Sequence, residues 1–65
     1  MPRSLGLGDL VVPYPRELRF FQRHGIGMIV YLYSYDVSQP RYGVRWLKSG
    51  KEMIFHADHL SRFNN

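Results

Sequence analysis

The sequence predicts a small all-β domain of five strands, and three observations lead to that prediction. Aromatic and β-branched residues dominate segments 25–35 and 42–46, a composition typical of paired strands rather than of helices. Glycine, proline and aspartate interrupt the apolar segments at short intervals, as expected for turns between strands. The chain has 65 residues, so it holds one domain at most.

The predicted domain spans residues 8–63, since residues 1–7 show no periodicity and are interpreted as an N-terminal tail. Its first strand is expected at residues 10–12, directly after a turn-forming Gly-Asp pair. Pro13 and Pro15 cannot donate a backbone hydrogen bond to a sheet, and we expect them to end this strand.

A long loop is expected between the first and second strands. Within segment 16–24, residues 17–23 have the composition of a single helical turn, but this stretch is too short to form a stable helix on its own. We expect Phe20 and Phe21 to anchor this loop on the domain. Gly25 and Gly27 follow it, and glycines at the start of a strand allow a bend or a bulge.

The alternation of the second strand predicts which side chains face the core. One face is aliphatic and is expected to point inward: Ile26, Met28, Val30 and Leu32. The other face is expected to point outward: Gly27, Ile29, Tyr31, Tyr33 and Tyr35. The three tyrosines of the outward face form a stripe where a ligand or partner would bind.

Turn-forming residues mark the boundaries of the later elements. Tyr42, Val44 and Trp46 share one face of the third strand and are expected to be structural. The Ser-Gly step of the next turn supplies the positive φ that a tight hairpin needs. The fourth strand has apolar residues on both faces, so its inward face stays open. We expect, in order, a connection at 36–40, the third strand at 42–46, a hairpin turn at 48–51, the fourth strand at 52–56, a one-turn 3₁₀ element at 57–60 and a last strand at 61–63.

Five stretches carry a resemblance to a known family: Gly8-Asp9, residues 25–30, residues 42–46, Gly50 and residues 56–60. Their order resembles that of the SH3-like small barrels over residues 8–63. The pattern is most similar to the Tudor-like and KOW-like branch, and to short stand-alone proteins encoded by bacteriophages and marine microbial genomes. The resemblance implies a five-stranded, strongly bent sheet that closes into an SH3-like barrel. The long first loop departs from the family pattern.

The resemblance and the charge together favour a binding module. Relatives among the SH3-like barrels bind nucleic acid, ribosomal components, methylated side chains or proline-rich peptides. The chain has nine Lys and Arg against five Asp and Glu, for a net charge of +4, and a basic balance favours polyanionic partners. The basic residues are scattered singly, however, which is equally typical of an ordinary solvated surface.

The residue types present argue against an enzyme. The chain has no Cys, its carboxylates are dispersed, and no serine lies in a nucleophile motif. The Gly25-Ile26-Gly27 stretch lacks the further residues of a phosphate-binding loop. We therefore expect neither catalysis nor a cofactor. No apolar run approaches the ~20 residues that span a bilayer, and the N-terminus lacks the apolar region of a signal peptide, so we expect a cytoplasmic protein without a membrane partner.

The histidines do not predict a metal site. His56 and His59 are three residues apart and meet only on a helical turn, with Asp58 as one further ligand. Metal sites generally need three or four ligands, so no metal is expected. We expect instead that His56 closes the fourth strand by a hydrogen bond and that Asp58 caps the turn that follows.

The predicted binding surface combines the tyrosine stripe with aromatic and basic residues around it. If the first loop folds over strands two and three, its arginines and Arg45 converge beside the tyrosines. Guanidinium groups would then neutralise phosphates while the rings stack on bases. The surface consists of Tyr31, Tyr33, Tyr35, Phe20, Phe21, Arg19, Arg23 and Arg45.

Three functions remain open on this surface. The first is a nucleic-acid or nucleoprotein accessory module. The second is a structural protein that self-associates through its tyrosine face and open strand edge, since tyrosine is enriched at interface cores. The third, less favoured, is a peptide reader of the SH3 type, which needs a groove of Tyr and Trp open to solvent. The partner, nucleic acid or protein, is left undecided.

Overall fold

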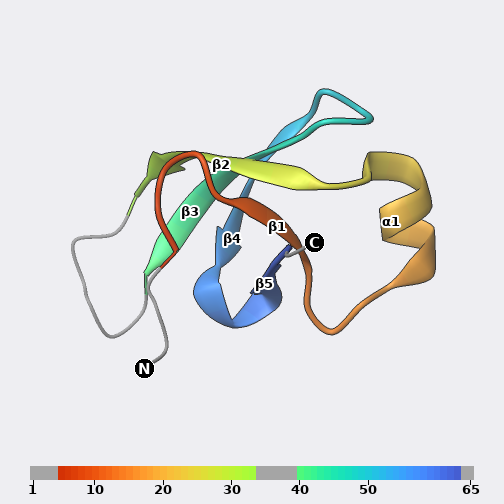
Figure 1. The fold of residues 1–65 in the computed structure, drawn as a ribbon, viewed down its shortest axis with the longest axis horizontal. Helices are drawn as coiled ribbons and strands as arrows, with labels where there is room; N and C mark the ends of the chain where they lie inside the picture. The colour runs from red at the N-terminus through yellow and green to blue at the C-terminus, as the bar shows by residue number, and fades with distance from the viewer. Residues whose placement is uncertain (1–4, 34–39, 64–65) are drawn as a thin grey trace.

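Five strands of the chain form one antiparallel sheet with a short helix at one end (Figure 1). The computed structural model describes residues 5–33 and 40–63. The strand order is β4-β3-β2-β1-β5. The elements are β1 (Leu10–Pro13), α1 (Leu18–His24), β2 (Gly27–Leu32), β3 (Arg41–Trp46), β4 (Glu52–His56), the 3₁₀ turn η1 (Ala57–His59) and β5 (Leu60–Arg62). The five strands and the 3₁₀ turn before the last strand confirm that part of the sequence prediction.

Helix α1 lies where the sequence predicted a loop, and that prediction was wrong for its second half. Phe20 and His24 lie on one face of the helix, with ring centroids 4.9 and 6.4 Å from that of Trp46. Short helices gain most of their stability from such tertiary packing. The helix ends at Gly25, whose φ of +72° favours glycine and whose N–H donates to the carbonyl of Phe21 at 2.8 Å.

The C-terminal end of α1 is held against the turn between β3 and β4. The N–H of Lys48 donates to the carbonyl of His24 at 3.0 Å, and its Nζ donates to the carbonyl of Gln22. The buried His24 ring forms a hydrogen bond between Nδ1 and Oγ of Ser49 at 2.7 Å. The helix and the hairpin therefore form one joined unit.

The inward face of β2 differs from the predicted one. Ile29 is fully buried and Gly27 is buried beside it, although both were expected outward. Val30 and Leu32 were expected in the core, and both are exposed. Tyr31 and Tyr33 do point outward as predicted, with exposed fractions of 56% and 48%. Tyr35 lies outside the described residues.

A β-bulge at Val30 explains why Ile29 is buried although Tyr31 is exposed as predicted. Ile29 pairs with Val44 and Tyr31 pairs with Gly43, so β2 advances two residues where β3 advances one. Val30 is the extra residue, and it resets the alternation of the strand. Ile29 can therefore face the core while Tyr31, two positions later, faces solvent. The bulge is not at Gly25 or Gly27, where the sequence suggested it.

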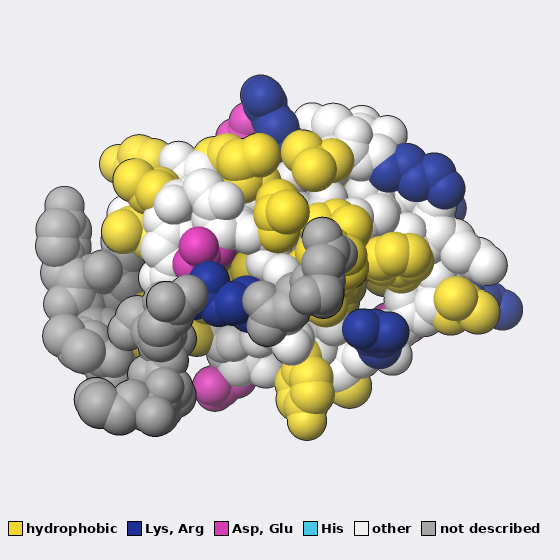
Figure 2. Space-filling model, viewed as in Figure 1, with side chains coloured by type: hydrophobic (Ala, Val, Ile, Leu, Met, Phe, Trp, Pro, Cys, Tyr) yellow, Lys and Arg dark blue, Asp and Glu magenta, His cyan; other side chains and the backbone are white. Residues whose placement is uncertain are grey.

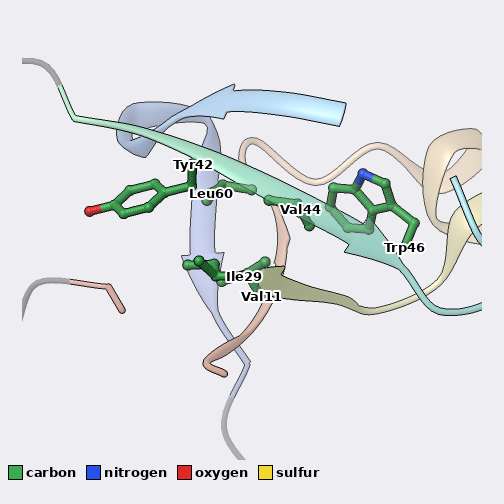
Figure 3. Packing of buried hydrophobic residues seen from close by; sticks show 6 residues of the cluster. All are labelled: Val11, Ile29, Tyr42, Val44, Trp46 and Leu60. Carbon is green, nitrogen blue, oxygen red and sulfur yellow. The ribbon is translucent and has the colours of Figure 1, made fainter. Parts of the chain in front are cut away.

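Residues from four strands form the core, and Figure 3 shows its aliphatic members between the rings of Tyr42 and Trp46. The core consists of Val11, Ile29, Tyr42, Val44, Trp46 and Leu60. The predicted structural role of the three β3 residues in this set is confirmed. Met53 and Phe55 of β4 pack against the same cluster, which settles the inward face that the sequence left open. Glu52, Ile54 and His56 consequently face away from the core.

Two turns follow local sequence chemistry, and one predicted cap does not form. Gly50 has a φ of +76°, as expected for the hairpin turn. Oδ2 of Asp9 accepts the N–H of Gly6 at 2.8 Å and lies 3.0 Å from Nη1 of Arg62, which ties the N-terminal turn to β5. Asp58 lies inside η1 rather than at its N-cap, so the predicted cap was wrong.

Across residues 5–33 and 40–63, no helix has the length and apolar character to cross a membrane.

Candidate functional site

The outward side chains of β2, β3 and β4 form a surface that we call the outer face. Its central row is set by strand register, because Tyr31 pairs with Gly43 and Gly43 pairs with Ile54. Ile54 has an exposed fraction of 57%, close to that of Tyr31. An apolar row open to solvent on a sheet is a typical site of recognition.

Two tyrosines lie together on this face because position 43 is glycine. The ring centroids of Tyr31 and Tyr33 are 4.5 Å apart, with the ring planes inclined by 46°. A Cβ at position 43 would lie 2.8 Å from Cε2 of Tyr33 and 3.1 Å from Cβ of Tyr31. The missing side chain therefore lets the Tyr33 ring cover the backbone of β3. The N–H of Tyr33 donates to the carbonyl of Arg41 at 3.0 Å, which continues the ladder past β2.

Arginines stand on both sides of Gly43 along β3. Arg41 and Arg45 are two positions from it in either direction, so all three share the outer face. Both arginines are exposed. Nη2 of Arg45 lies 2.9 Å from Oε2 of Glu52 on the neighbouring strand. Such exposed ion pairs contribute about 0–1 kcal/mol, so a phosphate can replace the carboxylate at little cost.

A groove of about 380 Å³ runs beside the tyrosine pair. This volume lies near the lower end of the range for small-ligand sites. Its walls are mainly apolar and aromatic, and its charged member is Glu52. The lining residues are Val30, Tyr31, Tyr33, Gly43, Glu52, Met53 and Ile54. The groove thus offers flat rings and one carboxylate acceptor at the solvent boundary.

The structure does not bring the α1 residues of the predicted surface to the tyrosines. Phe20 packs on Trp46, which pairs with Gly27 at the start of β2. Tyr31 lies four residues further along the strand, roughly 13 Å at about 3.3 Å per residue. Figure 1 shows α1 beside the start of β2, well removed from the other end of the strand. The condition for the predicted convergence, that this segment folds over strands two and three, is therefore not met.

The remaining predicted side chains of α1 line other depressions. Arg19 and Arg23 border a shallow pocket on the helix together with Glu17. Phe21 lines a separate apolar groove between α1, β1 and Phe63. Of the predicted binding residues that the structure describes, Tyr31, Tyr33 and Arg45 are the ones brought together on the outer face. Sequence reasoning missed Gly43 and Ile54 as site residues; the alternation of Arg41, Gly43 and Arg45 was the available signal.

The charges do not gather into one basic patch on the face drawn in Figure 2, where Lys and Arg side chains stand between hydrophobic ones.

The rings of His56 and His59 have centroids 6.3 Å apart. Among the described residues, no group of three or more His, Cys, Asp or Glu side chains is placed to hold a metal ion. The outer face is therefore the best-defined candidate site.

Comparison of the chain with protein-family models, with curated proteins and with solved structures found no match in any of the three. The geometry of the outer face is consequently the basis on which a function can be assigned to this protein.

Proposed function

We propose that this protein is a non-enzymatic binding module that holds single-stranded nucleic acid on its outer face. In this proposal Tyr31 and Tyr33 stack on bases, and Arg41 and Arg45 neutralise phosphates. The observation that carries the proposal is the exposed tyrosine pair, seated on Gly43 between two arginines of the same strand face. Ring stacking and phosphate contacts together are how sequence-tolerant single-strand binders work.

We also propose an SH3-like barrel as the architecture. The strand order supports this, with β1 between β2 and β5 and the 3₁₀ turn directly before β5. β4 and β5 are the two edges of the sheet in the described chain, and the barrel that we propose is a partly open one in which no backbone ladder joins these two edges. A cytoplasmic location stays a prediction from the sequence.

Self-association is the second candidate function, and the same face favours it. Ile54 and Val30 are exposed apolar side chains of this face on β4 and β2, and exposed apolar surface commonly marks protein interfaces. The peptide-reader hypothesis fits less well. It requires a tryptophan open to solvent, and Trp46, the single Trp of the chain, has an exposed fraction of 0%.

The test is binding of a labelled, short single-stranded oligonucleotide to the full chain, followed by fluorescence anisotropy over a salt series. We expect affinity to fall as salt rises, because phosphate contacts release counterions. Tyr31→Ala should weaken binding about tenfold, the loss of one stacked base. Tyr14→Ala is the matched control, since Tyr14 is slightly more exposed than Tyr31 but lies in the segment between β1 and α1. Absence of binding at low salt, or equal losses for both variants, would refute the proposal.

A further inference from the structure

Strand β4 has a free edge. It is the last strand in the sheet order, and no strand of the described chain pairs with its outer side. The N–H of Trp46 donates to the carbonyl of Lys51 at 2.8 Å, and the N–H of Ala57 donates to the carbonyl of Pro40 at 3.1 Å. Because an antiparallel strand directs its backbone groups to alternate sides, the odd-numbered residues of β4 bond to β3. The even-numbered residues direct theirs outward.

This edge lacks three of the features that commonly protect an edge strand from pairing with another strand. Edge strands are commonly guarded by proline, by a bulge or by an inward charge. β4 contains no proline, and its register with β3 runs without a shift from His56 to Glu52. Its central residue is the exposed Ile54. Backbone donors and acceptors thus stand in a regular row around an apolar side chain.

We propose that β4 pairs antiparallel with β4 of a second copy of this chain, about a two-fold axis through Ile54. In that register Ile54 meets its own counterpart, and Glu52 lies opposite the partner's His56. A carboxylate accepts a hydrogen bond from an imidazole N–H, and the symmetry makes this pair twice. The carboxylate of Glu52 already contacts Arg45 and has a second oxygen for the new bond.

Other pairings are less favourable. An axis at Glu52 would set two carboxylates opposite each other, which is destabilising. An axis at His56 would leave most of β4 without a partner strand. An axis at Met53 or Phe55 would set the apolar Ile54 opposite the partner's Glu52 or the partner's His56, a poorer cross-strand match than Ile54 against its own counterpart. Pairing with the other sheet edge is limited by β5, which has three residues against five in β4.

The dimer would join two outer faces into one surface. The row of Tyr31, Gly43 and Ile54 would continue into the same row of the partner. Five inter-strand steps of about 4.8 Å separate the two copies of Tyr31, roughly 24 Å in all. The inference stands on the strand edge alone, and it does not require that the surface bind nucleic acid.

The first test is the solution mass of the full chain by sedimentation over a concentration series, for wild type and Ile54→Pro. Proline at this position removes an outward N–H and leaves the ladder to β3 intact. We expect a dimer for the wild type and a monomer for Ile54→Pro, with unchanged Trp46 fluorescence. The control Ile54→Val keeps the N–H and should remain dimeric. A wild type that is monomeric throughout, or a dimer unaffected by the proline, overturns the proposal.

A charge exchange tests the register independently of the proline. Glu52→Lys should weaken the dimer about tenfold, and adding His56→Glu should restore it by exchanging the two partners of the pair. Positions 52 and 56 are about 13 Å apart within one strand, so this rescue must act between copies. A double variant no stronger than the single one overturns the register. A dimer that fails to bind oligonucleotide would support this inference and refute the proposed function.

Discussion

Tyr33, directly after β2, and Gly43 of β3 fit together, with no space for a side chain between the tyrosine ring and the backbone of residue 43. Gly43→Ala should move the ring and leave the fold intact, because the backbone at position 43 does not have a positive φ and alanine suits a strand better than glycine. We expect oligonucleotide affinity to fall several-fold while the unfolding midpoint changes little. Anisotropy and urea denaturation measure the two quantities. A large loss of stability would contradict this account of Gly43.

Gly27 packs against fully buried side chains, whereas Gly43 packs against exposed ones. A Cβ at position 27 would overlap Cγ1 of Val44 and lie 2.8 Å from Cε3 of Trp46, and both side chains are fully buried. Gly27→Ala should therefore destabilise the protein by about 1–3 kcal/mol, the usual cost of overpacking a core. Urea denaturation followed by Trp46 fluorescence checks this value. A stability equal to that of Gly43→Ala would show that the core relaxes around the methyl group.

Substitution of Phe20 can distinguish a structural role of this residue from a binding role. Phe20 was predicted from the sequence as a binding residue, yet its ring meets Trp46 and Phe55 in edge-to-face contacts at 4.9 and 5.9 Å. Phe20→Ala should cost about 2 kcal/mol of unfolding free energy, less than a fully buried phenylalanine because Phe20 is partly exposed. Oligonucleotide affinity of the folded fraction should stay unchanged. A loss of affinity without a loss of stability would restore Phe20 to the binding surface.

Oδ2 of Asp9 ties the N-terminal turn to β5. Asp9→Ala removes both the acceptor for the N–H of Gly6 and the ion pair with Arg62, and should cost about 1–2 kcal/mol. Asp9→Asn keeps an acceptor and loses the charge, so it should cost less. Thermal unfolding of the two variants separates the contributions. Equal losses would mean that the charge carries the whole effect.

The strands near Gly50 and the 3₁₀ turn were predictable because local chemistry sets them. Gly50 marks its turn by a positive φ that the sequence can indicate, and β4 begins directly after that turn. Helix α1 was not predictable from its own residues, because the contact that stabilises it is with Trp46, distant in sequence. The inward face of β2 was misread because the bulge is at Val30, a residue with no turn or glycine signature.

In the candidate site, the sequence predicted which tyrosines are exposed but not which residues surround them. Tyr31 and Tyr33 were assigned to the outward face because they alternate with the aliphatic residues of the segment. The pairing of Tyr31 with Gly43, and the exclusion of Arg19 and Arg23 from the same face, depend on strand register and on where α1 docks. Both are tertiary properties that alternation within one segment cannot report.

The bulge in β2 has a consequence for chain length. Without Val30, the strand would alternate perfectly: Gly27, Ile29 and Leu32 toward Val44 and its neighbours, Met28, Tyr31 and Tyr33 toward water. A chain from which this one valine is deleted should thus fold with all the remaining side chains of the strand on the sides that they have now. In an ordinary strand, the same deletion would exchange inside for outside beyond the cut.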